Sequence, residues 1–156
     1  MRVIFLDNRD SFVYNLVDLT AREAGVQVFR NTTPVATLRD ALEPTAEERA
    51  AGERPLLILS PGPGHPRQAG HMMEILDVAL QEKIPTLGIC LGFQAMVEAC
   101  GGVVTPVGAT HGRTDRVELT EAGIEDPSFF AIAETPRPGD EATHGYISIA
   151  RYHSLG

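Results

Sequence analysis

The chain has 156 residues, about the size of one domain and enough to bury a substantial core. Its 13 basic and 21 acidic residues give a formal net charge of -8, so the sequence has no electrostatic footprint for nucleic acid or for an anionic membrane. No apolar run approaches the roughly 18 residues of a membrane span, no signal-peptide pattern fits, and the two cysteines are poorly placed to bridge; we therefore expect a cytoplasmic protein.

The chain begins with a strand, a helix and a second strand. Residues 3–6 (VIFL) form a continuous apolar run, which is typical of a strand buried on both faces of a parallel sheet. Asp10 or Ser11 can N-cap a following amphipathic helix that Gly25 closes. Residues 26–29 predict the second strand.

A third strand at residues 56–59 (LLIL) leads into an unusual loop. It is preceded by a short helix predicted at 35–42 and a partly helical connection over 44–55. Residues 60–66 (SPGPGHP), called the Pro-Gly loop below, hold two glycines and three prolines, which force a stiff backbone with N–H groups free to face a ligand. A rigid turn and a binding loop both fit, whereas a nucleotide-binding loop would need a following Lys-Ser/Thr. A helix over 70–80 is predicted to fill the core with Met72, Met73, Leu76, Ala79 and Leu80.

Residues 85–94 (PTLGICLGFQ) are the most informative stretch. An apolar run leads into Gly88-x-Cys90-x-Gly92 and then into a helical pattern, which predicts a strand, a sharp turn and a helix. Such a nucleophile elbow needs small residues two positions before and after the nucleophile, and it would place Cys90 at a helix N-terminus, which favours the thiolate. The backbone N–H of Leu91 would then face an oxyanion. The alternative is that Cys90 is a small buried apolar residue.

The last third of the chain holds strand patterns separated by turns. Strands are predicted at residues 102–105, 117–120 and 146–150, and the segments 125–133 and 136–145 predict a turn-rich surface excursion. Strands that alternate with helices predict an α/β fold with an open, mostly parallel sheet flanked by helices.

Ligands of an open parallel sheet bind beyond the carboxyl ends of its strands. The segments that begin at Asp7, Ser60 and Cys90 all leave such ends. We therefore expect these three segments to share one edge of the sheet.

Four motifs resemble the class I glutamine amidotransferase family in the family's order. They are residues 6–16 (LDNRDSFVYNL), 59–66 (LSPGPGHP), 88–94 (GICLGFQ) and 151–155 (RYHSL). Within the family they look most like the glutaminase subunit of anthranilate synthase, and the glutaminase of aminodeoxychorismate synthase is very similar. The resemblance implies a flavodoxin-like fold and a single amidotransferase domain over residues 1–156.

The implied activity is hydrolysis of the glutamine side-chain amide, with the ammonia passed to a chorismate-using synthase large subunit, as in tryptophan biosynthesis. The resemblance implies no cofactor and no metal ion. Cys90 matches the family's nucleophile, which forms a γ-glutamyl thioester. The other matched positions are implied to contact glutamine or the oxyanion: Gly62, Pro63, Gly64, Leu91, Gln94, Ser154 and Leu155.

The sequence departs from the family pattern in two places. Phe93 stands where the family usually has His, at a position to which we assign no catalysis. The family's general base is a His in a His-Pro-Glu motif a few tens of residues after the Arg151 motif, and the chain ends before it, so we expect a C-terminally shortened form of a longer enzyme. Among the five histidines only His65 and His153 are candidates for a substitute base, and a structural role is the simpler interpretation of both.

Two other classes of function remain open at this point. A non-catalytic module would keep the glutamine pocket or the partner surface but lack turnover, because the general base is missing. An unrelated cysteine hydrolase or redox sensor would explain Cys90, but it explains neither the Pro-Gly loop nor the Arg151 motif.

Overall fold

The computed structural model describes residues 1–140 and 145–155, with side chains other than those of 109–111, 130 and 152–155. The chain forms two compact units, one built on residues 1–106 and one on residues 107–154. The first unit contains three of the four motifs singled out in the sequence.

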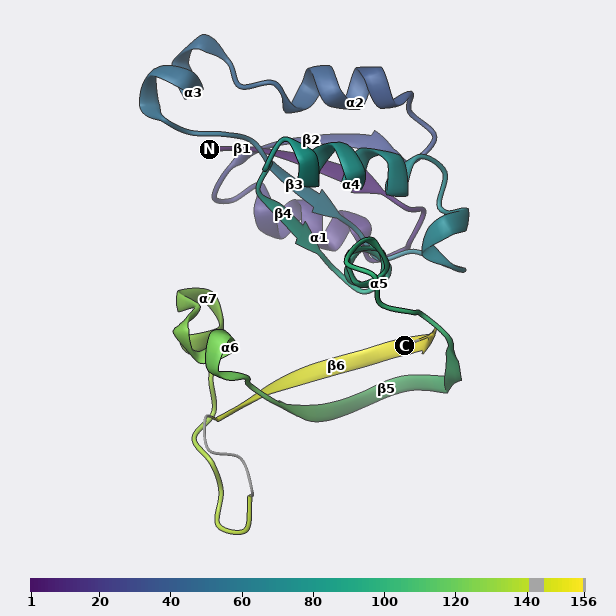
Figure 1. Cartoon of the computed structure of the whole chain (residues 1–156), viewed down its shortest axis with the longest axis vertical. Helices are drawn as coiled ribbons and strands as arrows, with labels where there is room; N and C mark the ends of the chain where they lie inside the picture. The colour runs from purple at the N-terminus through teal and green to yellow at the C-terminus, as the bar shows by residue number, and fades with distance from the viewer. Residues whose placement is uncertain (141–144, 156) are drawn as a thin grey trace. The chain divides into compact units, whose positions relative to one another are not determined.

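Four parallel strands form the sheet of the first unit (Figure 1). Their order is β2-β1-β3-β4, with β1 at the centre beside β3. The strands are β1 (Arg2–Asp7), β2 (Gly25–Arg30), β3 (Leu56–Leu59) and β4 (Thr86–Gly88). The open, parallel sheet predicted from the sequence is confirmed.

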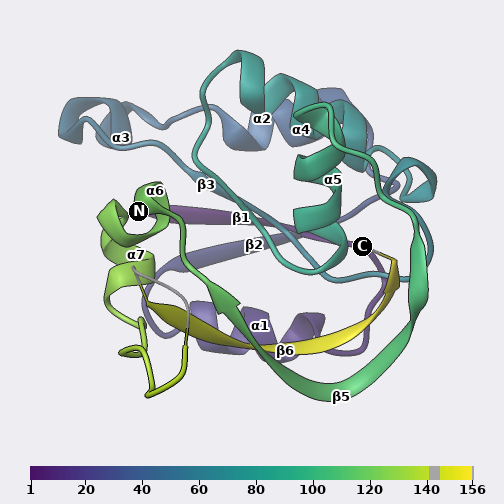
Figure 2. The ribbon, with the colours of Figure 1, turned by 60° about the horizontal axis from the view of Figure 1, so that its bottom comes forward.

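Helices cover both faces of this sheet (Figure 2). The helix α1 lies on one face, and α2 and α4 lie on the other. The helical segments of this unit are α1 (Val13–Thr20), α2 (Val35–Leu42), α3 (Ala46–Ala51), the 3-10 turn η1 (Pro66–Gln68), α4 (Met72–Gln81) and α5 (Leu91–Ala99).

Alternate residues of β1 and β3 enter two separate apolar clusters. Ile4 and Leu57 pack with α2, α4 and α5, whereas Val3, Phe5 and Ile58 pack with α1. Successive side chains of a strand point to opposite faces, so a strand that is covered on both sides must be apolar throughout. This explains why the runs VIFL and LLIL are continuous rather than alternating.

Three local predictions about α1 and α4 are wrong. The cap of α1 is Phe12, without a side-chain hydrogen bond, and Asp10 Oδ1 instead accepts the Phe12 N–H at 2.8 Å. The helix ends at Thr20, so Gly25 opens β2 and does not close α1. Leu80, predicted to lie in the core, is 44% exposed, because it lies outside the stripe of α4 that faces the sheet.

The second unit contains a two-stranded sheet and two short helices. The strands are β5 (Pro106–Glu118) and β6 (Tyr146–Leu155), and between them lie α6 (Glu121–Glu125) and α7 (Pro127–Phe130). Residues 102–105 form no strand, which contradicts the sequence prediction, and residues 106–118 form one long strand. Within the described part of the chain, no helix is both long enough and apolar enough to cross a membrane.

Candidate active site

The loops that follow β1 and β3 are hydrogen-bonded to each other at the carboxyl edge of the sheet. The Asn8 backbone N–H donates to Ser60 Oγ at 2.9 Å, and the Asn8 side-chain amide donates to the Ser60 carbonyl at 3.0 Å. Both residues are buried. The side-chain Oδ1 of Asn8 has no hydrogen-bond partner among the described residues, so the two donated bonds are what ties Asn8 to the start of the Pro-Gly loop.

The Pro-Gly loop also reaches the elbow that follows β4. A Cβ atom added at Gly62 would lie 2.6 Å from Asn8 Cβ and 2.7 Å from Leu91 Cδ2, so no larger residue fits without displacement. Gly64 has a φ of 78°, the left-handed region that glycine adopts without strain. The three segments that begin at Asp7, Ser60 and Cys90 therefore converge at one edge, as predicted.

Cys90 occupies a strained turn between β4 and α5. It is one of three non-glycine residues with positive φ among the described residues, at φ 54° and ψ -106°, and it caps α5. A Cβ at Gly88 would lie 2.6 Å from the Gly92 carbonyl oxygen, and a Cβ at Gly92 would lie 2.2 Å from the Leu59 carbonyl oxygen. Small residues are needed on both sides of the elbow, as predicted, because other backbone segments pack directly against Gly88 and Gly92.

The Cys90 thiol is partly exposed, and its surroundings favour the neutral form. Burial raises the pKa of this thiol, and the nearby Asp10 carboxylate raises it further, while the N–H of Leu91 donates to the sulfur and offsets part of the effect. The Leu91 N–H at the helix N-terminus acts in favour of the thiolate, as expected, but the net shift of the pKa is upward. Desolvation outweighs the single backbone donor.

Two other predicted site residues belong to the same helix. Leu91 is 1% exposed, and its side chain supports Gly62, while its N–H faces the Cys90 sulfur. Gln94 is buried, and its backbone N–H donates to the Cys90 carbonyl at 3.0 Å. Ser154 and Leu155 lie at the end of β6, and their side chains are outside the described residues.

With this geometry in place, comparisons with known proteins decide the family. The profile described as "Glutamine amidotransferase class-I" matches residues 4–155. The chain belongs to the class-I glutamine amidotransferase family. Among curated relatives of this amidotransferase, anthranilate synthase component 2 of Corynebacterium glutamicum is 46% identical over 99% of the chain and 69% of the relative.

Further relatives carry the same name. Anthranilate synthase component 2 of Vibrio parahaemolyticus is 39% identical, over 98% of the chain and 67% of the relative. The pyocyanine-specific component 2 of Pseudomonas aeruginosa is 40% identical, over 99% of the chain and 67% of the relative. The amidotransferase chain thus spans about two thirds of the length of these relatives.

Solved structures agree on the fold of this amidotransferase. A glutamine amidotransferase of Methylobacillus flagellatus superposes with a TM-score of 0.56 at 18% identity, over 99% of the chain and 55% of that structure. The protein SMU.1228c gives a TM-score of 0.61 at 19% identity, over 99% of the chain and 62% of that structure.

His65, one of two candidates for a substitute base in this amidotransferase, is held by structural contacts. Its Nδ1 accepts the Arg67 backbone N–H at 3.3 Å, which caps η1. Its Nε2 lies 3.5 Å from Glu98 Oε1 on α5. Because Nδ1 caps η1 and Nε2 lies beside Glu98, the simpler structural interpretation is favoured for His65. The other candidate, His153, has its side chain outside the described residues.

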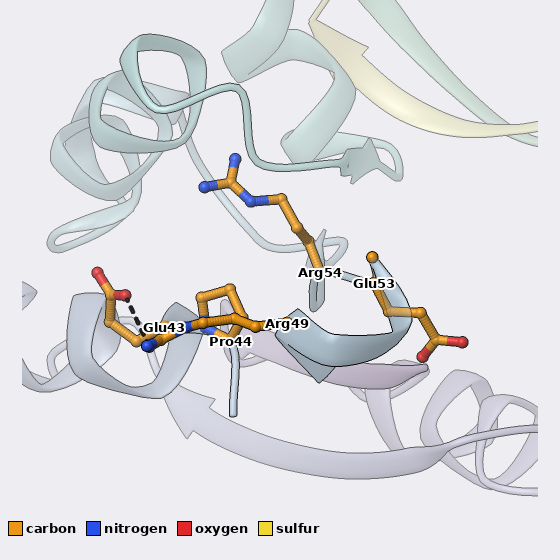
Figure 3. A pocket seen from close by; sticks show the side chains of 6 residues that line it. Glu43, Pro44, Arg49, Glu53 and Arg54 are labelled. Carbon is orange, nitrogen blue, oxygen red and sulfur yellow. Dashed lines mark ion pairs between the residues drawn. The ribbon is translucent and has the colours of Figure 1, made fainter. Parts of the chain in front are cut away.

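An open hollow at the α3 end of the first unit holds none of the predicted site residues (Figure 3). The Arg49 guanidinium nitrogen Nη2 lies 3.7 Å from Glu43 Oε2, and Glu53 Oε2 lies 3.1 Å from the N-terminal amine. Arg54 Nη1 donates a hydrogen bond to the Glu82 carbonyl at 2.6 Å. Each charged side chain that lines this hollow already has a partner. Its lining consists of Glu43, Pro44, Arg49, Gly52, Glu53 and Arg54.

Sequence reasoning missed three residues that shape the site. Asn8 and Asp10 both lie in the motif of residues 6–16, where only Asp10 has a suggested role, as a helix cap, and Glu98 lies in none of the four motifs. Their roles depend on contacts between residues far apart in the chain, so no local spacing reveals them. For Asn8 a signal was present, because a polar residue directly after a fully buried strand must find a hydrogen-bond partner.

Proposed function

We propose that this chain is the glutaminase component of an anthranilate synthase. It hydrolyses the side-chain amide of glutamine and delivers ammonia to a chorismate-using large subunit. The observation that carries the proposal is the contact of the Pro-Gly loop with the elbow, where Gly62 packs against Leu91 and the Leu91 N–H faces the Cys90 sulfur. That arrangement supports a site in which the nucleophile, the Leu91 N–H and the Pro-Gly loop lie together at the carboxyl edge of the sheet.

The chemistry proceeds through a thioester. The Cys90 sulfur attacks the amide carbonyl carbon, and the oxygen takes up negative charge beside the Leu91 N–H. Collapse of this intermediate breaks the carbon–nitrogen bond and releases ammonia once the nitrogen has gained a proton. Water then hydrolyses the thioester to glutamate and restores the thiol. Two moderate barriers replace the single high barrier of direct amide hydrolysis.

The attack requires a base, because burial and Asp10 raise the pKa of the Cys90 thiol. A base positioned for proton transfer contributes about 10²–10⁴-fold to such a reaction. The family pattern assigns this task to the His of the His-Pro-Glu motif, which is not among the 156 residues. In the proposal, the base takes the thiol proton and returns it to the leaving nitrogen.

The site of the proposal comprises Cys90 as nucleophile and seven residues that hold glutamine or the oxyanion. Gly62 and Leu91 are supported by their mutual packing, and Gln94 by its place on the first turn of α5. The full set is Cys90, Gly62, Pro63, Gly64, Leu91, Gln94, Ser154 and Leu155.

The remaining parts of the proposal concern context. Residues 1–156 belong to one amidotransferase domain, although the described chain forms two compact units. The chain assembles with a large subunit, as the name "component 2" of its relatives supports, and it acts in the cytoplasm. The product pathway is tryptophan biosynthesis.

The test is glutamate release from glutamine, measured with an anthranilate synthase large subunit present. Cys90→Ser is expected to lower the rate by roughly 10³-fold or more, because the nucleophile is lost. Cys100→Ser is the matched control, since Cys100 is a free, exposed cysteine at the other end of the same helix. Equal rates for the parent and Cys90→Ser would overturn the proposal.

Covalent labelling tests whether the glutamine site is present, independently of whether the chain turns glutamine over. The glutamine-like electrophile 6-diazo-5-oxo-L-norleucine should add to Cys90 and not to Cys100, as read by peptide mass spectrometry. Labelling without glutamate release would instead identify a glutamine-binding module without turnover.

A further inference from the structure

The carboxylate of Glu98 is a buried charge that the proposed chemistry does not use. It lies near the end of α5, about two helical turns after Cys90, and its side chain is 5% exposed. Burying a carboxylate is costly unless cationic or hydrogen-bonding partners surround it. The partners of the Glu98 carboxylate therefore indicate which segment it stabilises.

The partners of Glu98 are His65, at the end of the Pro-Gly loop, and Arg67, in the η1 turn that follows it. Arg67 Nε lies 2.9 Å from Glu98 Oε2, and His65 Nε2 lies 3.5 Å from Glu98 Oε1. The Arg67 contact is an ion pair without hydrogen-bond alignment, since Oε2 has no hydrogen-bond partner among the described residues. The attraction is therefore mainly one of charge.

The segment that Glu98 holds is itself rigid. The His65 Nδ1 accepts the Arg67 backbone N–H, and the Gln68 N–H donates to the His65 carbonyl at 2.9 Å. The other ring nitrogen, Nε2, lies 3.5 Å from Glu98 Oε1. The ring of His65 thus connects η1 to α5.

The Pro-Gly loop is consequently anchored at both ends. Asn8 holds Ser60 at its start, and Glu98 holds His65 at its end. The segment between them contains Gly62, which packs against Leu91, and Gly64, which has a positive φ. Glu98 lies on α5, the helix that Cys90 caps. The same helix therefore positions both the end of the Pro-Gly loop and the nucleophile.

We propose that Glu98 is a positioning residue: through His65 and Arg67 it fixes the Pro-Gly loop at its distance from the Cys90 sulfur. The inference rests on the proposed glutaminase function and deepens it. A displacement of about 1 Å in such a site can lower a rate by up to roughly 100-fold, so a contact remote from the sulfur can control the reaction.

The test compares two reactions of Cys90 in the purified chain. One is labelling by 6-diazo-5-oxo-L-norleucine, which must occupy the glutamine site, and the other is alkylation by iodoacetamide, which needs only an accessible thiol. In Glu98→Gln the ratio of the first rate to the second is expected to fall about 10- to 100-fold. Glu74→Gln is the matched control, because Glu74 of α4 forms an exposed pair with the preceding His71, with 2.9 Å between Oε1 and Nδ1. This variant should leave the ratio unchanged.

Variants of Arg67 address the case in which Glu98→Gln does not fold. Arg67 is 67% exposed, so Arg67→Ala should fold, lower the ratio about threefold and raise hydrogen exchange of amides in residues 62–69. Arg67→Lys should restore both values, because it retains the charge. A purely structural role would lower the urea midpoint of these variants without changing the ratio.

The outcomes separate this inference from the proposed function. If the parent chain shows no preference of Cys90 for the glutamine-like reagent, the glutaminase proposal fails. If the parent shows the preference and both Glu98→Gln and Arg67→Ala retain it, the glutaminase proposal stands and the positioning role of Glu98 is refuted.

Discussion

Asn8 and Ser60 are joined by two hydrogen bonds, one from the Asn8 backbone N–H to Ser60 Oγ at 2.9 Å and one from the Asn8 side-chain amide to the Ser60 carbonyl at 3.0 Å. The same amide nitrogen lies 3.2 Å from Met72 Sδ. These contacts link the ends of β1 and β3 to α4. They hold the Pro-Gly loop before any ligand arrives.

Replacement of Asn8 should therefore destabilise the chain. Asn8→Ala removes the side-chain donor and leaves the buried Ser60 carbonyl without it, which is expected to lower the free energy of unfolding by about 1–3 kcal/mol. Urea denaturation followed by circular dichroism measures the change. Asn15→Ala, at an exposed position of α1, is the control and should change little. Equal midpoints for the two variants would show that the bond contributes nothing.

The elbow should tolerate no side chain at Gly92. The added Cβ of Gly92→Ala would lie 2.2 Å from the Leu59 carbonyl oxygen, so β3 and α5 must separate, at an expected cost of ~3 kcal/mol. Thermal unfolding is the measurement. Gly25→Ala is the matched control, since its Cβ meets no atom within 4 Å, and its effect should stay within about 0.5 kcal/mol. A Gly92→Ala variant as stable as Gly25→Ala would contradict the described packing.

The reactivity of Cys90 should depend on Asp10. Burial and then Asp10 raise the pKa of the thiol, so less thiolate is present at pH 8 than in a free cysteine. Asp10→Asn removes one negative charge and lowers the thiol pKa, so iodoacetamide should label Cys90 faster at pH 8. Asp18→Asn, at an exposed position of α1, is the control.

The rates are read at the Cys90 peptide in a Cys100→Ser background, because Cys100 is also free. A pH–rate profile separates a shift of the pKa from a change in access. Identical profiles for the parent and Asp10→Asn would exclude an electrostatic effect of Asp10.

The pair of Arg2 and Glu48 should make stability depend on acid pH. Arg2 donates to both carboxylate oxygens of Glu48, at 3.3 and 3.1 Å, and these hydrogen bonds hold the pKa of Glu48 below its usual range. A lowered folded-state pKa contributes stability above the unfolded value, and that contribution is lost as the pH falls through the folded one.

The Glu48→Gln variant should therefore be less stable than the parent at pH 7, by about 1 kcal/mol, and the difference should shrink below the ordinary glutamate pKa. Urea titrations at several pH values measure it. Glu47→Gln, the exposed neighbour on α3, should show no such pH-dependent difference. A gap between parent and Glu48→Gln that is constant with pH would contradict the assignment.

The sequence predicted best those features that depend on local patterns. The run VIFL is buried on both faces, residues 35–42 form α2 with the predicted bounds, and the Gly88-x-Cys90-x-Gly92 spacing produces the strained elbow. In each case the deciding interactions are among neighbours in the chain, or follow from burial on both faces of a sheet.

The features that the sequence did not predict depend on tertiary contacts. The pKa of Cys90 follows from desolvation by the assembled site, which a helix N-terminus alone does not indicate. The partners of Glu98 come from a segment that precedes α4 and β4, so no pattern within α5 points to them. Residues 102–105 are apolar enough for a strand but pair with no other strand among the residues that the structure describes.

The positive φ of Cys90 lowers the stability of the fold at the residue that supplies the reactive thiol. A side chain in that conformation costs on the order of 1–2 kcal/mol, which glycine would not incur. Cys90→Gly should therefore melt at a higher temperature than the parent while lacking the thiol altogether. Selection for heat resistance alone would discard this cysteine, so its presence in the turn reflects a demand other than durability.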